Sequence, residues 1–375
     1  MNAAEDQRML DRFARLCEIA SPTGEEREAA DAVLDELRGL GVDVAEDASA
    51  TPARAGAGNL VARVPGRSDR WLSFFAHLDT VPHDGPISVV REGGVFRSAG
   101  DTILGADNKA AVTVLMELAL RHRAEPAPVG LELIFTVAEE EGLRGAKELD
   151  IASLSAPFGY VLDHATPIGE LIVAAPTHKQ LLAEFTGREA HAGLSPEDGH
   201  SAITAAAVAI SQMKLGRLDE ETTANVGMIE GGTASNVVAG RCRILGEARG
   251  VDGERAAATI GAMVDACTWG ASQNDCEVDA QVSEMFRGYR LDPKSEAVRI
   301  ASEALRTTGH DPQLVATGGG SDANALIAAG YDAVLLANGT EANHTPDELV
   351  TEEAIVEMLR VCEAAIGLVG DVEAP

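Results

Sequence analysis

The order of strand-like and helix-like segments changes twice along this chain, and this change most constrains its fold. Between residues 59 and 162, apolar strands such as Leu72–Ala76 and Leu131–Val137 alternate with helical stretches. Residues 180–284 instead follow the order strand, helix, strand, strand, helix, strand, which is that of a ferredoxin-like unit. Alternation resumes at Ser295. We therefore predict an α/β domain, with a mixed sheet flanked by helices, interrupted by a smaller α+β domain.

The length of the chain agrees with this division, because 375 residues suit two domains better than one. We place the first part of the larger domain at residues 1–175, the inserted domain at 176–286 and the second part of the larger domain at 287–375.

The charge balance argues against two classes of partner. The chain has 60 acidic and 30 basic residues, a net charge of −30, so we expect it to bind neither nucleic acid nor an anionic membrane. The N-terminus lacks the apolar core of a signal peptide, and no run of 18 apolar residues occurs. Five scattered cysteines without CxxC spacing indicate neither disulfides nor a thiolate zinc site. We expect a cytoplasmic protein.

The triplet His77-Leu78-Asp79 is the first candidate for chemistry. It ends an apolar run that begins at Trp71, which places an imidazole and a carboxylate together where a buried strand ends. A metal-binding histidine usually donates its other ring N–H to a carboxylate, which fixes its tautomer. Taken alone, the triplet is more typical of a strand end with a solvated histidine.

Four more candidates lie at strand ends or in loops. Asp107 precedes a long apolar helix, Glu140 and Asp163 follow apolar strands, and His344 lies in a loop after another strand. Each has an ordinary alternative as a helix cap, a solvated acid or a loop histidine. Together with His77, however, they form a set of two imidazoles and three carboxylates, which suits a pair of zinc-like ions. Such ions lower the pKa of water to about 7, and the neighbouring Glu139 is placed to transfer the proton.

These residues belong to motifs that resemble a known family, the co-catalytic zinc metallopeptidases that include peptidase T and bacterial glutamate carboxypeptidase. The resemblance covers nearly the whole chain, with Ala138 as one departure, since some relatives carry an acid there. The motifs are His77-Leu-Asp79, Gly105-Ala-Asp107-Asn108, Thr136-Val-Ala-Glu139-Glu140-Glu141-Gly142, Asp163, Glu189-Ala-His191-Ala-Gly193, Gly319-Gly320-Ser321-Asp322 and His344-Thr-Pro-Asp-Glu348.

The resemblance implies a role for each candidate at the metals. Asp107 would bridge the two ions and would precede a non-proline cis peptide bond near Asp107-Asn108. His77 and Asp163 would complete the ligand set of one ion. Glu140 and His344 would complete that of the other.

Further roles are implied for residues that bind no metal. Glu139 would be the general base, and Asp79 the partner of His77. His191 would stabilise the oxyanion, often in the active site of the partner subunit. Asn236 and Arg249 resemble substrate-binding residues, and the fork of Arg249 could hold a substrate carboxylate, although a surface salt bridge is an equally good interpretation from the residues alone.

By this likeness, the fold is a phosphorylase/hydrolase-like zinc peptidase domain with an inserted ferredoxin-like lid and dimerisation domain. The implied function is a homodimeric aminopeptidase with two Zn²⁺ ions, replaceable by Co²⁺ or Mn²⁺, that hydrolyses short peptides, in particular tripeptides. The alternatives are an N-acyl-amino-acid amidohydrolase, a carboxypeptidase, or a non-catalytic protein that binds metal or peptide. The presence of Glu139 beside all five ligand candidates argues against the last.

Overall fold

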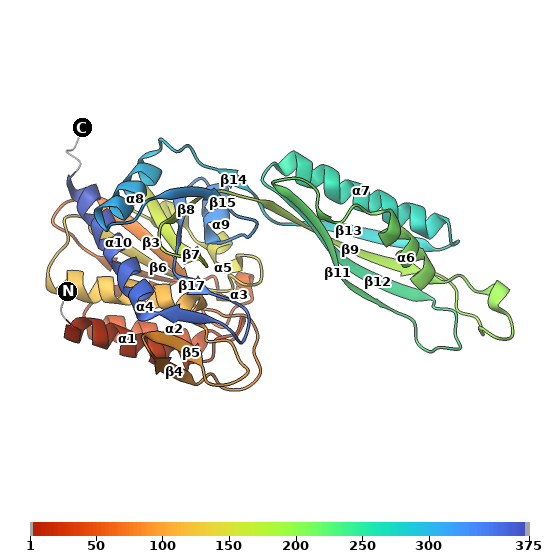
Figure 1. The fold of residues 1–375 in the computed structure, drawn as a ribbon, viewed down its shortest axis with the longest axis horizontal. Helices are drawn as coiled ribbons and strands as arrows, with labels where there is room; N and C mark the ends of the chain where they lie inside the picture. The colour runs from red at the N-terminus through yellow and green to blue at the C-terminus, as the bar shows by residue number, and fades with distance from the viewer. Residues whose placement is uncertain (1–2, 372–375) are drawn as a thin grey trace. The chain divides into compact units, whose positions relative to one another are not determined.

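The computed structural model describes residues 3–371 and divides into two compact units (Figure 1). Unit 1 contains the chain up to Val173, Leu291–Ala316 and the chain from Ser321 onward. Unit 2 contains Ala174–Arg290 and Thr317–Gly320. Among the described residues, no helix combines the length and the apolar character needed to cross a membrane.

Unit 1 is built on a mixed sheet with the strand order β1-β2-β6-β3-β7-β16-β8, and β15 pairs with β8. A smaller sheet has the order β17-β18-β5-β4. The strands are β1 (Asp43–Glu46), β2 (Leu60–Val64), β3 (Trp71–His77), β4 (Val89–Glu92), β5 (Val95–Ser98), β6 (Gly130–Thr136), β7 (Phe158–His164), β8 (Glu170–Ala175), β15 (Gln313–Ala316), β16 (Asp332–Ala337), β17 (Thr340–Glu341) and β18 (Leu349–Thr351).

The helices of unit 1 pack around the sheet, with α4 buried along most of its length. A continuous buried core joins α4 to α1, α2, α8, α10 and the strands, which explains why every residue of β6 is buried. The helices are α1 (Ala3–Cys17), α2 (Arg27–Gly39), α3 (Ala50–Ala53), α4 (Ala106–Ala124), α5 (Arg144–Glu148), α8 (Glu296–Thr307), α9 (Asp322–Ala328) and α10 (Glu352–Asp371).

Unit 2 is an antiparallel sheet with the order β10-β11-β12-β9-β13, and α6 and α7 lie together along it (Figure 1). Alternate residues of the strands, such as Leu181 and Ile244, form a separate core with these helices. The elements are β9 (Thr177–Thr186), α6 (Ala202–Gln212), β10 (Gly216–Arg217), β11 (Thr222–Gly231), β12 (Arg241–Gly250), α7 (Gly253–Ser272), β13 (Glu277–Phe286) and β14 (Tyr289–Arg290).

The predicted fold class is confirmed: unit 1 is α/β with a mixed sheet, and unit 2 has the order of a ferredoxin-like fold. The sequence interpretation missed β1, β8, β10, β14, β17 and β18. Five of these six strands have two to four residues, too few to show a period, and only one of the four β1 residues is buried.

Candidate metal centre

Parallel strands bring the candidate ligands to one edge of the unit 1 sheet. Strands β3, β6 and β7 run parallel, and His77 at the end of β3 pairs in register with Thr136 at the end of β6. Asp163 occupies the penultimate position of β7, and Glu139 and Glu140 follow β6 in a tight turn. The carboxyl ends of parallel strands meet at a common edge, where α/β proteins gather their sites.

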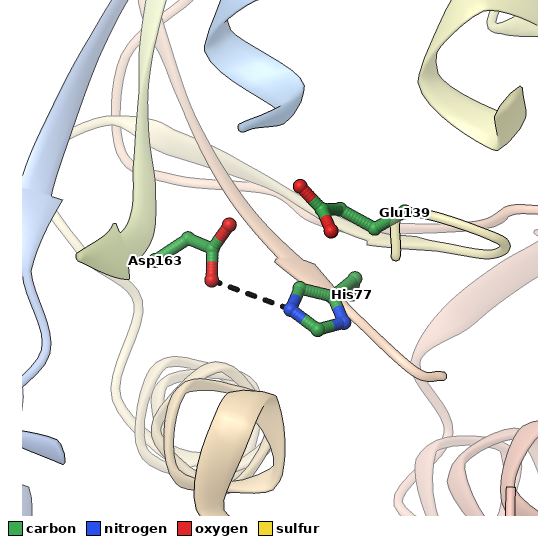
Figure 2. Close-up of side chains that lie close together, drawn as sticks. All are labelled: His77, Glu139 and Asp163. Atoms are coloured by element: carbon green, nitrogen blue, oxygen red, sulfur yellow. Dashed lines mark ion pairs between the residues drawn. The ribbon is translucent and has the colours of Figure 1, made fainter. Parts of the chain in front are cut away.

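His77 lies at the centre of this group. Its Nε2 atom is 3.2 Å from Oδ1 of Asp107 and 3.3 Å from Oδ1 of Asp163. Figure 2 shows the imidazole facing Asp163, with the carboxylate of Glu139 on the adjacent segment. All four side chains are largely buried.

His344 reaches the same group from the loop between β17 and β18. Its Nε2 atom is 3.2 Å from Oδ2 of Asp107 and 3.1 Å from Oε1 of Glu140. Its side chain remains half exposed, whereas that of Glu140 is largely buried. Asp107 therefore directs one carboxylate oxygen to each imidazole, so the structure brings all five residues together.

Two subsets of this group are compact enough to hold one ion each. The ligand atoms of His77, Asp107 and Glu140 all lie within 4.8 Å of one another, as do those of His77, Glu139 and Asp163. Both subsets differ from the ligand sets that the resemblance implies: the first joins His77 to Glu140, which are expected at different ions, and the second contains Glu139. The proximity of Glu139 fits either a ligand or a proton-transfer group, and metal counting on a variant separates the two.

Asp79 is oriented differently from the implied pairing with His77. The Nδ1 atom of His77 is 2.9 Å from the backbone oxygen of Asp79 but 3.6 Å from its carboxylate. That carboxylate instead accepts hydrogen bonds from the backbone N–H groups of Glu139 at 2.9 Å and Glu140 at 3.2 Å, and from the Thr23 hydroxyl at 2.7 Å. Asp79 therefore fixes the tautomer of His77 through its backbone and holds the Glu139–Glu140 turn through its side chain.

Glu26 supports the same turn and was missed by the sequence interpretation. Its fully buried carboxylate accepts hydrogen bonds from the backbone N–H groups of Gly24, Gly56 and Ala138 at 3.0, 2.5 and 3.2 Å. Ala138 has a φ of 49°, in the left-handed region. Glu26 immediately precedes α2, so its sequence position is indistinguishable from that of an acid that complements the helix dipole.

The start of α4 shows the backbone that the resemblance implies. The peptide bond between Asp107 and Asn108 is cis, which confirms that prediction. The side-chain amide of Asn108 donates to the backbone oxygen of Leu162 at 2.9 Å and to Oδ1 of Asp163 at 3.2 Å. Asn108 therefore links the loop that carries Asp107 to the strand that carries Asp163.

The electrostatics of the cluster fit cations. Burial raises the pKa of Asp163 to about 8 and raises the pKa values of Glu139 and Glu140 above their usual range. Burial also raises the pKa of Asp322 to about 6, and its buried Oδ1 atom has no hydrogen-bond partner. Burial opposes ionisation of Asp107 too, but hydrogen bonds from both imidazoles outweigh it and lower the pKa. These buried carboxylates have few positively charged groups beside them within the protein, and they lie next to two imidazoles. Such a set of side chains suits divalent cations.

His191, Asn236 and Arg249 belong to unit 2. The backbone N–H next to His191, that of Ala192, donates to the backbone oxygen of Asn236 at 3.0 Å, so these two predicted residues lie on adjoining loops. Both side chains are exposed.

Arg249 lies near the end of β12 and is held by its neighbours. Its Nε and Nη2 atoms donate to the two carboxylate oxygens of Glu247 at 3.1 and 3.2 Å, and Nη1 donates to the backbone oxygen of Gly318 at 3.2 Å. These bonds use three of the five guanidinium N–H groups. Arg249 thus forms an ion pair and keeps donors for a further acceptor.

Comparison with known proteins places this geometry in a family. The model of peptidase family M20/M25/M40 matches residues 74–367, which includes every predicted site residue. The Bacillus subtilis protein YqjE, which is described as uncharacterised, is 39% identical over 363 residues that cover 96% of this chain and 98% of that protein.

Two solved structures resemble the chain over nearly its full length. The aminopeptidase PepT from Bacillus cereus has a TM-score of 0.85 and 37% identity, covering 96% of this chain and 98% of that one. A tripeptidase from Staphylococcus aureus has a TM-score of 0.91 and 34% identity, covering 97% and 98%. At these identities and coverages, the likeness extends to both units.

Proposed function

This chain belongs to peptidase family M20/M25/M40, a family of dinuclear metallopeptidases, and from that premise we propose that it is a di-zinc aminopeptidase for short peptides, with tripeptides as the preferred class. The observation that carries the proposal is the convergence of His77, Asp107, Glu140, Asp163 and His344 beside Glu139. The similarity to an aminopeptidase and a tripeptidase along almost the whole chain supports the substrate class.

The donor set supports two zinc ions, with Co²⁺ or Mn²⁺ as functional substitutes. Asp107 would contribute to both ions in this proposal, because its two carboxylate oxygens face different imidazoles. His77 and Asp163 would complete one ion, and Glu140 and His344 the other. Bound cations would supply Lewis acidity at the scissile carbonyl and a water of lowered pKa.

Glu139 is the general base and acid in this proposal. Its side chain is almost fully buried, and its backbone N–H donates a hydrogen bond to the carboxylate of Asp79. The carboxylate would take a proton from the attacking water and return it to the leaving amine. Because the turn that carries Glu139 also carries Glu140, this anchoring fixes the proton-transfer group relative to one metal ligand.

The inserted domain supplies the remaining roles that we propose. We assign the lid and dimerisation functions to residues 176–286, and His191 to oxyanion stabilisation across a homodimer interface. Asn236 and Arg249 would bind the substrate, with the free donors of Arg249 directed to its carboxylate. We also propose a cytoplasmic location, which is consistent with the five free cysteines.

The proposal is tested with purified protein, metal analysis and three substrate classes assayed in parallel. Free tripeptides should be cleaved from the amino end faster than dipeptides, and N-acetylated amino acids should be poor substrates. Hydrolysis of acylated amino acids with no cleavage of free peptides would identify an amidohydrolase and refute the aminopeptidase assignment.

The role of Glu139 is tested by Glu139→Gln, which keeps the size of the side chain but removes the basic group. Turnover should fall by roughly 10²–10⁴-fold while two equivalents of metal remain bound. Loss of one metal equivalent would show that Glu139 is a ligand. Unchanged turnover would exclude it as the base.

A further inference from the structure

A buried carboxylate joins the two loops that carry Asp107 and His344. Glu348, four residues after His344, has an exposed fraction of only 1%. Its Oε2 atom accepts hydrogen bonds from the backbone N–H groups of Leu104 and Gly105, both at 2.8 Å, and its Oε1 atom accepts one from Asp107 at 2.9 Å. The backbone of Asp107 is therefore held directly by this side chain.

The donors of these bonds come from the segment that leads into α4. The first N–H groups of a helix have no acceptor within the helix and need one from elsewhere. The side chains usually found at such positions come from the helix start itself, but Gly105 precedes α4 and has none. Glu348, which directly precedes β18, accepts the hydrogen bonds of this segment although it lies more than 240 residues away along the chain.

The loop of His344 is closed by the backbone of the same residue. The backbone N–H of Glu348 donates to the backbone oxygen of Thr345 at 3.1 Å, which closes the turn that follows His344. Nε2 of His344 then lies 3.2 Å from Oδ2 of Asp107. Glu348 thus links the Asp107 segment through its side chain to the loop that carries His344 through its backbone.

We propose that Glu348 is a positioning residue of the metal centre, whose carboxylate sets the Asp107 loop at the distance from His344 at which both can hold one ion. The inference rests on the proposed function, because it concerns the same pair of metals. Outer partners of metal ligands typically change metal affinity or activity by about 10–100-fold when they are replaced.

The chain offers a matched control in Glu132 on β6. This carboxylate is fully buried and also accepts backbone hydrogen bonds, from Ser155 and Ala156, all at 3.0 Å. Its other partners are the Ser73 hydroxyl and the guanidinium of Arg63, and none of the four is a candidate ligand. Replacing either glutamate by glutamine turns one acceptor oxygen into a donor that faces backbone N–H groups. Both variants should therefore unfold at a lower urea midpoint than the wild type, because each leaves buried donors unsatisfied.

The experiment compares Glu348→Gln with Glu132→Gln in the full-length protein. Zinc affinity is measured by competition with a chromophoric chelator, and the Co²⁺-substituted proteins are compared by visible absorption. We expect Glu348→Gln to weaken at least one zinc site by about 10–100-fold and to alter the Co²⁺ spectrum. Glu132→Gln should keep wild-type zinc affinity and spectrum.

A second variant covers the case in which Glu348→Gln does not fold. Glu348→Asp keeps the negative charge but shortens the side chain by one methylene group, which moves the carboxylate away from the backbone N–H groups. We expect its zinc affinity to lie between those of the wild type and the glutamine variant. Wild-type affinity in the folded Glu348 variants would overturn the inference, and so would an equal loss in Glu132→Gln. Absence of tight zinc binding in the wild-type protein would instead refute the proposed metal centre, and the inference with it.

Discussion

Replacing Asp79 by asparagine separates its two contacts, one to His77 and one to the Glu139–Glu140 turn. The backbone oxygen that faces His77 is retained in the variant, whereas one carboxylate oxygen becomes an amide group. The least costly orientation keeps the amide oxygen at the Oδ2 position, which accepts from both Thr23 and Glu140. The amide NH₂ then faces the N–H of Glu139, which loses its acceptor at 2.9 Å.

The magnitude follows from this single loss. One buried donor without a partner costs about 1–3 kcal/mol of folding free energy, which urea denaturation of the variant should show. Metal affinity should stay close to that of the wild type, because the ligands and the backbone contact of His77 are unchanged. Turnover should fall by about 10–100-fold, since the base has lost its anchor.

Parallel measurements of zinc affinity and tripeptide kinetics on Asp79→Asn check this reasoning. Thr23→Val is the control, because it removes one hydroxyl donor from the same carboxylate but leaves both backbone contacts. If Asp79→Asn weakened zinc binding while turnover per bound metal stayed constant, the carboxylate would act through His77 and not through the Glu139–Glu140 turn.

Two further predictions concern stability. A hydrogen bond from His178, followed by the ion pair with Arg249, lowers the pKa of Glu247 from its usual 4.5 to about 2, so Glu247 stabilises the fold above pH 4.5 and loses this effect as the pH falls from 4.5 toward 2. The urea midpoint of Glu247→Gln should therefore lie below that of the wild type at pH 7, and the gap should narrow as the pH falls below 4 and nearly close by about pH 2, whereas a gap that stays constant down to that pH would contradict the pairing. In Gly145→Ala, the new Cβ atom would lie 2.1 Å from the backbone oxygen of Val137, so we expect a loss of at least about 1–3 kcal/mol. Gly261→Ala in α7 meets no atom within 4 Å and should instead gain about 0.5–1 kcal/mol; thermal melts that shift equally in both glycine variants would refute the comparison.

Long, regular elements could be predicted from the sequence because their periods are local. The helix after Asp107 and the apolar strand that begins near Leu131 extend over enough residues for the pattern to be unambiguous. The short strands β17 and β18 could not be predicted, since they exist only through pairing with each other and with β5. Yet these strands border the loop that carries His344, so part of the site depends on an element without a sequence signal.

By itself, the sequence determined the α/β class and the inserted ferredoxin-like order and indicated the candidate metal ligands, because chemistry and periodicity are properties of the residues themselves. Only the tertiary structure decided how these residues are supported. The acceptors for the N–H groups of Ala138, Glu139 and Asp107 are Glu26, Asp79 and Glu348, which lie 60 to 241 residues away along the chain. A buried carboxylate accepts hydrogen bonds from whichever donors the fold brings to it, so its partners cannot be predicted from the local sequence.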